Sequence, residues 1–146
     1  MVQTIFLPDD AATAALGRRL AAILRPGDLV LLDGELGSGK TALARATIRA
    51  LLGDESLDVP SPSFALVQPY EANAKFVLHA DLYRLASARD IDELGLLERA
   101  AAIVLVEWPD RAPQLTALAS GRIGLAIPAG GEGRMATIEM DDGRQV

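Results

Sequence analysis

The chain has 146 residues, about the length of one domain, and 50% of them are hydrophobic, which is enough to form a core. Its net charge of −6 argues against a broad electrostatic surface for nucleic acid, so we expect any RNA that matters to this protein to be held by another chain. The absence of cysteine excludes disulfides, thiolate metal sites and a thiol nucleophile.

The beginning of the chain predicts a strand followed by a helix. Residues 4–7 form a short strand candidate, and residues 1–8 contain no basic region followed by a long apolar stretch, so we expect a cytoplasmic protein without membrane contact. Asp9 or Asp10 is a suitable cap for a helix whose apolar residues recur with the helical period. Thr13 lies early in this helix and has two interpretations. It either lines a pocket for the nucleotide base or lies on the solvent-facing surface of the helix.

The next segment carries a phosphate-binding loop between a buried strand and a helix. Residues 28–32 are a short apolar run, and residues 34–41 (GELGSGKT) fit the pattern G-x-x-x-x-G-K-[ST] at every required position. The glycines allow consecutive N–H groups to turn toward phosphate oxygens, Lys40 brings a positive charge to the β and γ phosphates, and Thr41 offers a hydroxyl to Mg²⁺. Residues 41–52 then keep helical apolar spacing up to a glycine. We therefore predict a nucleotide site.

A segment rich in proline and serine follows. Residues 59–64 (VPSPSF) cannot form a helix, because two prolines alternate with the serines and hold the backbone extended. P-loop enzymes often carry a nucleotide-sensing switch at this distance from the loop, although a rigid connector fits the composition as well. Residues 64–70 and 75–81 are predicted strands, and residues 71–74 are a predicted hairpin connection, so we expect the two strands to be antiparallel neighbours.

Acidic side chains end two of the predicted strands. His79 and Asp81 lie two residues apart at the end of one strand and so share a face. His79 is interpreted equally well as a packed histidine or as a catalytic one. Burying a carboxylate such as Asp81 is unfavourable unless a cation or hydrogen-bond donors compensate its charge. Residues 102–108 form the most strand-like run, which reaches Glu107. A P-loop fold needs an acid on a strand adjacent to the loop to hold the Mg²⁺ shell, so Glu107 is the Walker B candidate.

The remaining segments complete the predicted fold. Residues 88–94 predict a short helix with an acidic face, bent at the next glycine and continued through residues 96–102. Residues 122–127 and 135–140 predict two strands that extend the sheet as an antiparallel edge. We expect a single domain, residues 1–146, with a P-loop NTPase-like α/β fold in three layers, whose mixed sheet is parallel at its centre and antiparallel at its edge strands.

Five segments carry a resemblance to a known family. They are GELGSGKT at 34–41, SPSF at 61–64, HADLYR at 79–84, DELG at 92–95 and LVEWP at 105–109. Together they resemble the bacterial TsaE (YjeE) family, the small P-loop ATPases of tRNA threonylcarbamoyladenosine (t6A) synthesis. The resemblance runs in order from about Leu7 to Pro109 and thins out in the C-terminal strands.

The resemblance implies an ATPase that binds ATP or ADP with Mg²⁺ and turns over efficiently only with partners. These partners are the two-subunit transferase, of the TsaD and TsaB type, that modifies adenosine 37 of tRNA, so contact with tRNA itself is expected to be indirect. The resemblance also implies a set of phosphate-holding residues, namely Gly37, Ser38, Gly39, Lys40, Thr41 and Ala42. Thr41 and Glu107 are implied to coordinate Mg²⁺.

The same resemblance implies roles for residues outside the loop. Asp81 corresponds to an essential acid that orders the attacking water or the metal shell, which makes Lys40, Asp81 and Glu107 the implied catalytic residues. Residues 61–64 resemble the switch of the family, with Ser63 where threonine is usual, so a hydroxyl is kept. Two further positions, Thr13 and Arg134, fall where members of the family approach the nucleotide. His79 and Trp108 also match the family, and the resemblance implies no particular role for them.

Two other functions use a similar loop. A small-molecule or nucleotide kinase needs a second substrate pocket and usually an arginine-bearing lid, and no arginine-rich lid segment is evident. Arg111 follows a predicted strand and either reaches phosphate or faces solvent. A nucleotide-dependent binding module would use ATP only to order residues 61–64 for a partner, with incidental turnover.

Overall fold

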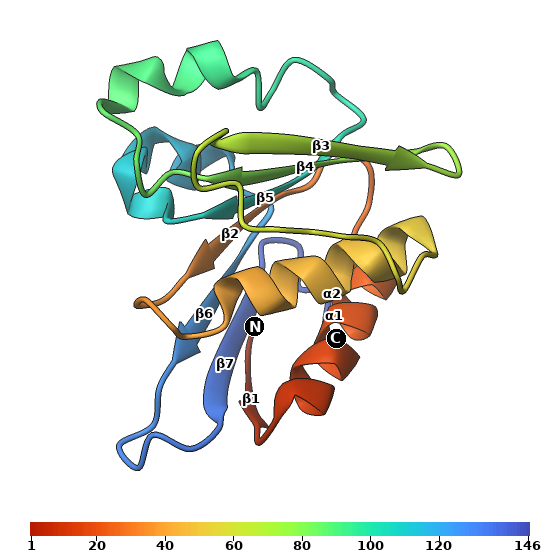
Figure 1. The fold of residues 1–146 in the computed structure, drawn as a ribbon, viewed down its shortest axis with the longest axis vertical. Coiled ribbons are helices and arrows are strands. Elements are labelled where there is room, and N and C mark those ends of the chain that lie inside the picture. Colours follow the sequence, from red (N-terminus) through yellow and green to blue (C-terminus); the bar gives the residue numbers. More distant parts are fainter.

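A seven-stranded mixed sheet organises the protein, in the order β1-β7-β6-β2-β5-β4-β3 (Figure 1). The structure is a computed structural model that describes residues 1–146. The strands are β1 Val2–Leu7, β2 Leu29–Asp33, β3 Val67–Ala72, β4 Lys75–Asp81, β5 Ile103–Glu107, β6 Gly121–Ala126 and β7 Arg134–Met140. The helices are α1 Asp10–Ile23 and α2 Lys40–Leu52, with the 3₁₀ helices η1 Ala88–Leu94, η2 Pro109–Arg111 and η3 Pro113–Leu118.

The sheet is parallel at its centre and antiparallel at its edges, as the P-loop NTPase-like fold class requires. β2 pairs in parallel with both β5 and β6, and β4 pairs in parallel with β5. The prediction that residues 122–127 and 135–140 form an antiparallel edge is confirmed for the pairing of β6 with β7. On its other side β6 pairs in parallel with β2, because the chain reaches β6 from β5 through a crossover that contains η2 and η3. The sheet becomes antiparallel from β6 outward, because β7 pairs antiparallel with both β6 and β1.

Helices α1 and α2 lie side by side and cover one face of the sheet (Figure 1). Their close approach depends on Gly17, because a Cβ at that position would lie 2.5 Å from the Cβ of Ala46. Asp9 caps α1 by accepting the N–H of Ala12 at 2.8 Å, as its sequence predicts. Apolar side chains of both helices, including Leu16 and Ile48, pack with those of the central strands in one core cluster.

The opposite face of the sheet is covered by the three 3₁₀ helices and their turns, which form the third layer. A second core cluster lies there and includes Leu31, Ile91 and Leu115. The prediction that residues 96–102 continue a helix is wrong. Gly95 adopts φ +68 and ends η1, and the following hydrogen bonds, such as Ala102 N–H to the Arg99 carbonyl, span only three residues.

The strand predicted at residues 64–70 begins three residues later, at Val67. The N–H of Leu66 donates to the carbonyl of Pro62 at 2.8 Å, so the preceding residues form a turn. β3 and β4 are antiparallel neighbours, as predicted. The two residues between them, Asn73 and Ala74, have φ +53 and +66, the positive values that a tight type I′ hairpin turn needs.

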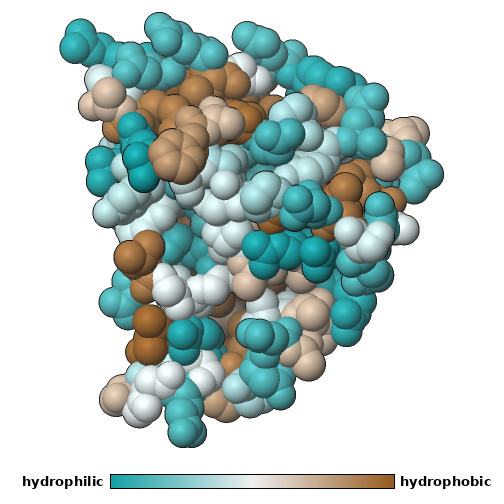
Figure 2. Space-filling view, in the orientation of Figure 1, coloured by the Kyte–Doolittle hydropathy of each residue, from teal (hydrophilic) through white to brown (hydrophobic).

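Surface character differs between the two ends of the molecule. In Figure 2, hydrophobic atoms gather toward the upper left, over the region of β3 and the 3₁₀ helices, whereas the surface over α1 and α2 mixes hydrophilic and pale atoms. Phe64 is the most exposed large apolar side chain, at 85%. No helix combines the length and the apolar character that crossing a membrane requires.

The C-terminal segment is attached to the body by an ion pair between Arg144 and Asp28. Arg144 donates Nη1 to Asp28 Oδ2 at 2.7 Å, Nη2 to Oδ1 at 3.0 Å, and Nη1 also to the carbonyl of Ile23 at 2.7 Å. Burial alone would raise the pKa of Asp28, but hydrogen bonds from Arg144 and from the backbone of Arg25 lower it below its ordinary value.

We expect Arg144→Ala to lower the free energy of unfolding at pH 7 by about 2–3 kcal/mol, because charged hydrogen bonds to a buried carboxylate are lost. Because the pKa of Asp28 is depressed on folding, the stabilisation is present above its unfolded pKa of about 3.9 and is lost as the pH falls through its folded pKa. Urea unfolding at pH 7 and near pH 3 measures both effects. Arg25→Ala is the control, because its ion pair with Asp142 is exposed and worth about 0–1 kcal/mol; equal losses for both variants contradict the prediction.

Candidate functional site

Three neighbouring parallel strands end at the same edge of the sheet and bring acidic residues into a row. In the register of the sheet, Glu107 of β5 stands opposite Leu32 of β2 on one side and Asp81 of β4 on the other. The glycine-rich loop begins directly after β2. Ligands of open α/β sheets bind at the carboxyl ends of such strands, so this edge is the candidate site.

The glycine-rich loop is shaped by positions that only glycine satisfies. Gly34 has φ +149, and a Cβ there would lie 2.5 Å from Ser38 Oγ and 2.6 Å from the carbonyl oxygen of Leu125. Gly39 has φ +102 and directly precedes α2, whose N-terminus points its free N–H groups at the loop. Ser38 is buried, and its Oγ has no hydrogen-bond partner.

Lys40 is held inside this loop. Its Nζ donates to the carbonyl oxygens of Gly34 at 2.5 Å and Glu35 at 3.0 Å, and it lies 4.1 Å from the centroid of the Trp108 ring. Burial lowers the pKa of Lys40, although nearby carboxylates, Glu107 first among them, act in the opposite direction. The lysine charge is therefore paired with backbone dipoles and an aromatic face.

Glu107 is a buried carboxylate with two hydrogen-bond partners. It is 2% exposed, and Thr41 Oγ1 lies 2.9 and 3.1 Å from its two carboxylate oxygens. His79, fully buried, places Nε2 at 2.6 Å from Glu107 Oε2, while its Nδ1 has no partner. A carboxylate oxygen can only accept a hydrogen bond, so the nitrogen that carries the proton in this contact is Nε2. Both neighbours therefore donate to the carboxylate.

Asp81 connects the site to the proline- and serine-rich segment. Its Oδ2 accepts a hydrogen bond from Ser61 Oγ at 3.1 Å, and Ser61 Oγ lies 2.9 Å from Ser63 Oγ. Its Oδ1 accepts the N–H of Tyr83 at 2.9 Å, which fixes the turn after β4. The conformation of residues 61–63 thus depends on the carboxylate at the end of β4.

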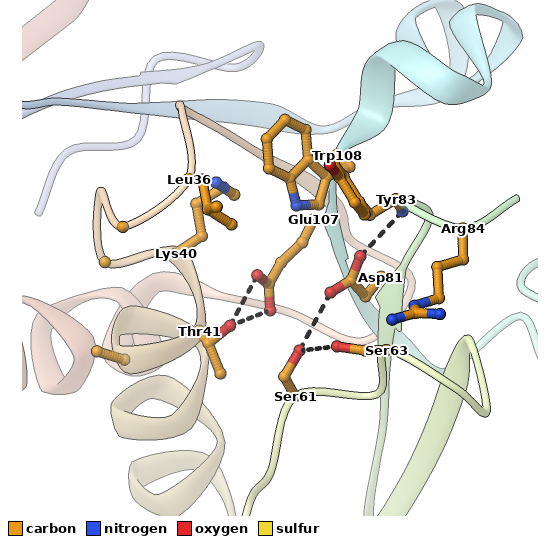
Figure 3. Close-up of a pocket in the computed structure, with 13 residues that line it drawn as sticks. Leu36, Lys40, Thr41, Ser61, Ser63, Asp81, Tyr83, Arg84, Glu107 and Trp108 are labelled. Carbon is orange, nitrogen blue, oxygen red and sulfur yellow. Dashed lines mark hydrogen bonds between the residues drawn. The ribbon is translucent and has the colours of Figure 1, made fainter.

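These residues surround one cavity of about 450 Å³ (Figure 3). It brings together all of the residues that the sequence nominated as catalytic and most of those nominated for phosphate binding, namely Gly37, Gly39, Lys40, Thr41, Ala42, Asp81 and Glu107. Ser61, Ser63 and Trp108 line it as well. Leu36, Tyr83 and Arg84 were not nominated from the sequence, although the last two directly follow the strand end that carries Asp81.

Thr13 lies outside this cavity, in a smaller one of about 240 Å³ on another side of the loop. That cavity is shared with Gly37, Gly39 and Arg134. Arg134 donates Nη2 to the carbonyl of Gly37 at 3.0 Å, so β7 braces the glycine-rich loop. Arg111 packs against the ring of Tyr83, 5.3 Å from its centroid, and does not line the main cavity.

Thr41 and Glu107 offer the hard oxygen ligands that Mg²⁺ prefers. Their oxygens lie within hydrogen-bond distance of each other, so the hydroxyl and the carboxylate face a common point at the start of α2. No group of three or more His, Cys, Asp or Glu side chains is placed to hold a metal ion. Mg²⁺ in nucleotide sites usually takes one or two protein ligands and completes its shell with phosphate oxygens and water, so the pair fits a shared metal ion.

Comparisons with known proteins agree on one family. A family model described as threonylcarbamoyl adenosine biosynthesis protein TsaE matches residues 7–135. Two relatives named tRNA threonylcarbamoyladenosine biosynthesis protein TsaE are 39% identical over 73% of this chain, in Rickettsia felis, and 32% identical over 74% of it, in Haemophilus influenzae. The matches span 62% and 72% of those relatives, so the chain covers less than two thirds of the first.

A solved structure supports the fold. The crystal structure of Bacillus subtilus YdiB superposes with a TM-score of 0.74 at 22% identity, over 97% of this chain and 88% of that one.

We expect His79→Ala to lower the free energy of unfolding by about 2–4 kcal/mol, because it leaves a cavity and removes one of two donors to a buried carboxylate. His79→Gln should lose less than half as much, since its amide nitrogen can donate from near the position of Nε2. Urea unfolding of both variants at pH 7 measures the difference. Equal losses in the two variants would contradict the prediction. They would show that His79 stabilises the fold by packing alone and not through its bond to Glu107.

Proposed function

This chain belongs to the TsaE family of tRNA threonylcarbamoyladenosine biosynthesis proteins, and from that premise we propose that it is a Mg²⁺-dependent ATPase that works with the transferase of that pathway. One observation carries the proposal. A single cavity is lined by the loop residues Lys40 and Thr41 together with the carboxylates of Glu107 and Asp81. Phosphoryl transfer is catalysed mainly by positioning and electrostatic stabilisation, and these are the groups that it requires.

The loop holds the phosphates in the proposed function. Backbone N–H groups of residues 37–42 donate to phosphate oxygens at the N-terminus of α2, and Lys40 turns from the loop carbonyls to the β and γ phosphates. The smaller cavity that contains Thr13 and Arg134 adjoins the same loop glycines and is proposed to receive the base end of ATP or ADP.

Thr41 and Glu107 would hold Mg²⁺, which supplies a positive charge on the transferring phosphoryl group when bound. His79 fixes the orientation of the Glu107 carboxylate through its Nε2. Asp81 is proposed to orient the attacking water. It lines the cavity, and its Oδ2 accepts a hydrogen bond from one side chain, Ser61, so the same oxygen can accept a second bond from water. Water attacks the γ phosphorus, the bond from that atom to the bridging oxygen breaks, and ADP and phosphate leave.

The partners are proposed to be the two transferase subunits of the TsaD and TsaB type, with the protein acting in the cytoplasm as one domain, residues 1–146. The net charge of −6 favours contact with tRNA through those subunits rather than directly. A kinase is the rival enzyme. Kinases usually place an arginine at the transferred phosphoryl group, and Arg84, which lines the cavity, is such an arginine although the sequence showed no arginine-rich lid. A binding module with incidental turnover is the rival of another class.

We expect Lys40→Ala to weaken ATP binding about 10- to 100-fold, because a charged contact to phosphate is lost. Isothermal titration with ATP and Mg²⁺ measures the affinity. Lys75→Ala is the matched control, since Lys75 is the other lysine of the chain, lies exposed at the start of β4 and should leave the affinity unchanged. An unchanged ATP affinity in Lys40→Ala would contradict the assignment of residues 34–41 as the phosphate-binding loop.

We expect Glu107→Gln to reduce phosphate release at saturating ATP by about 100-fold or more, because the amide is a poor ligand for the metal shell. Phosphate release is measured with and without the transferase subunits, whose stimulation of the unmodified protein distinguishes an ATPase from a kinase that needs a small acceptor. Nucleotide binding in EDTA serves as the control and should persist. Normal turnover by Glu107→Gln would place the metal shell elsewhere.

A further inference from the structure

Arg84 is a cation at the cavity whose charge is not used by the fold. It follows the end of β4 by three residues, in the turn that the bond from Tyr83 N–H to Asp81 fixes. In Figure 3 its guanidinium lies on the side of the cavity formed by Ser63 and Asp81, opposite Lys40. No hydrogen bond or ion pair of the structure involves the donors of Arg84, although the chain contains 20 acidic residues.

An aromatic ring holds this guanidinium in place. Arg84 Cζ lies 4.4 Å from the centroid of the Phe64 ring, and Phe64 is 85% exposed. A large apolar side chain in so open a position gains little from burial, so its contact with the guanidinium is the interaction that the structure shows for it. Stacking on the face of the guanidinium leaves its N–H donors free around the edge.

The position of Phe64 links the arginine to the serine hydroxyls. Phe64 directly follows Ser63, whose Oγ pairs with Ser61 Oγ, which in turn donates to Asp81. One short segment therefore contacts both the acid of the site, through Ser61, and the unpaired cation, through Phe64. A change in the conformation of this segment must move both contacts together.

We infer that Arg84 is a further catalytic residue, which donates hydrogen bonds to the γ-phosphoryl group and is positioned by Phe64. The inference rests on the proposed function. Lys40 approaches the phosphates from the loop, and Arg84 approaches from the opposite wall, so the two cations flank the group on which negative charge is redistributed during hydrolysis. Arg84 remains protonated throughout and donates hydrogen bonds only.

The proposed contact of Arg84 distinguishes ATP from ADP, because only ATP carries a γ-phosphate. ADP lacks the group that Arg84 contacts, so its binding should depend on the loop alone. A non-hydrolysable ATP analogue contains the group and should bind less tightly when Arg84 is removed. A residue that merely supports the fold would change both affinities in parallel, so the ratio of the two affinities is the discriminating measurement.

The test uses Arg84→Ala, with Arg111→Ala as the matched control, because Arg111 also packs against an aromatic ring but does not line the cavity. Affinities for ADP and for the imido analogue of ATP, both with Mg²⁺, are measured by isothermal titration. We expect Arg84→Ala to bind ADP within twofold of the unmodified protein, to bind the analogue about 10-fold more weakly and to release phosphate about 1,000-fold more slowly. Arg111→Ala should keep both affinities and the rate.

A second variant tests the part played by Phe64. Phe64→Ala should produce a smaller loss of analogue affinity than Arg84→Ala, and the double variant should lose no more than Arg84→Ala alone, because both changes remove one interaction. An unchanged ratio of analogue to ADP affinity in Arg84→Ala, with normal turnover, overturns the inference while the ATPase proposal stands. Absence of ATP binding by the unmodified protein overturns the proposed function and the inference together.

Discussion

A carboxylate that is almost fully buried must be compensated, and the compensation of Glu107 determines the arrangement of the site. Its two partners come from different elements, Thr41 from the start of α2 and His79 from β4. Because β5 lies between β2 and β4, one side chain fixes the distance from the glycine-rich loop to the strand that carries Asp81. The geometry of the cavity therefore follows from satisfying a single buried charge.

Much of the fold could be predicted from local patterns. Helices α1 and α2 and strand β4 have strong periodicity and clear capping or stopping residues, so their predicted bounds agree with the structure within a few residues. Pairing direction depends on the connection rather than on the strand itself, which explains why the antiparallel pairing of β6 with β7 could be predicted and its parallel pairing with β2 could not. Residues 96–102 have apolar spacing but follow Gly95, whose positive φ ends the helix.

The site was only partly predictable for a related reason. The glycine-rich loop, Asp81 and Glu107 each occupy positions that local rules identify, a loop between strand and helix or the end of an apolar strand. Arg84 and Tyr83 belong to a turn, and no periodicity shows which way a turn directs its side chains. Their place at the cavity emerges only from the bond between Tyr83 and Asp81 and from the packing of Phe64.

The contacts of Lys40 affect how the affinity of this site should be understood. Two backbone carbonyls and the Trp108 ring already satisfy the lysine charge, so they compete with any incoming phosphate for the same donor. A nucleotide gains only the difference between its own contact and those it displaces. The loop carbonyls and the indole thus compete with a phosphate for the charge of Lys40, so part of each phosphate contact only replaces an interaction that the protein already makes.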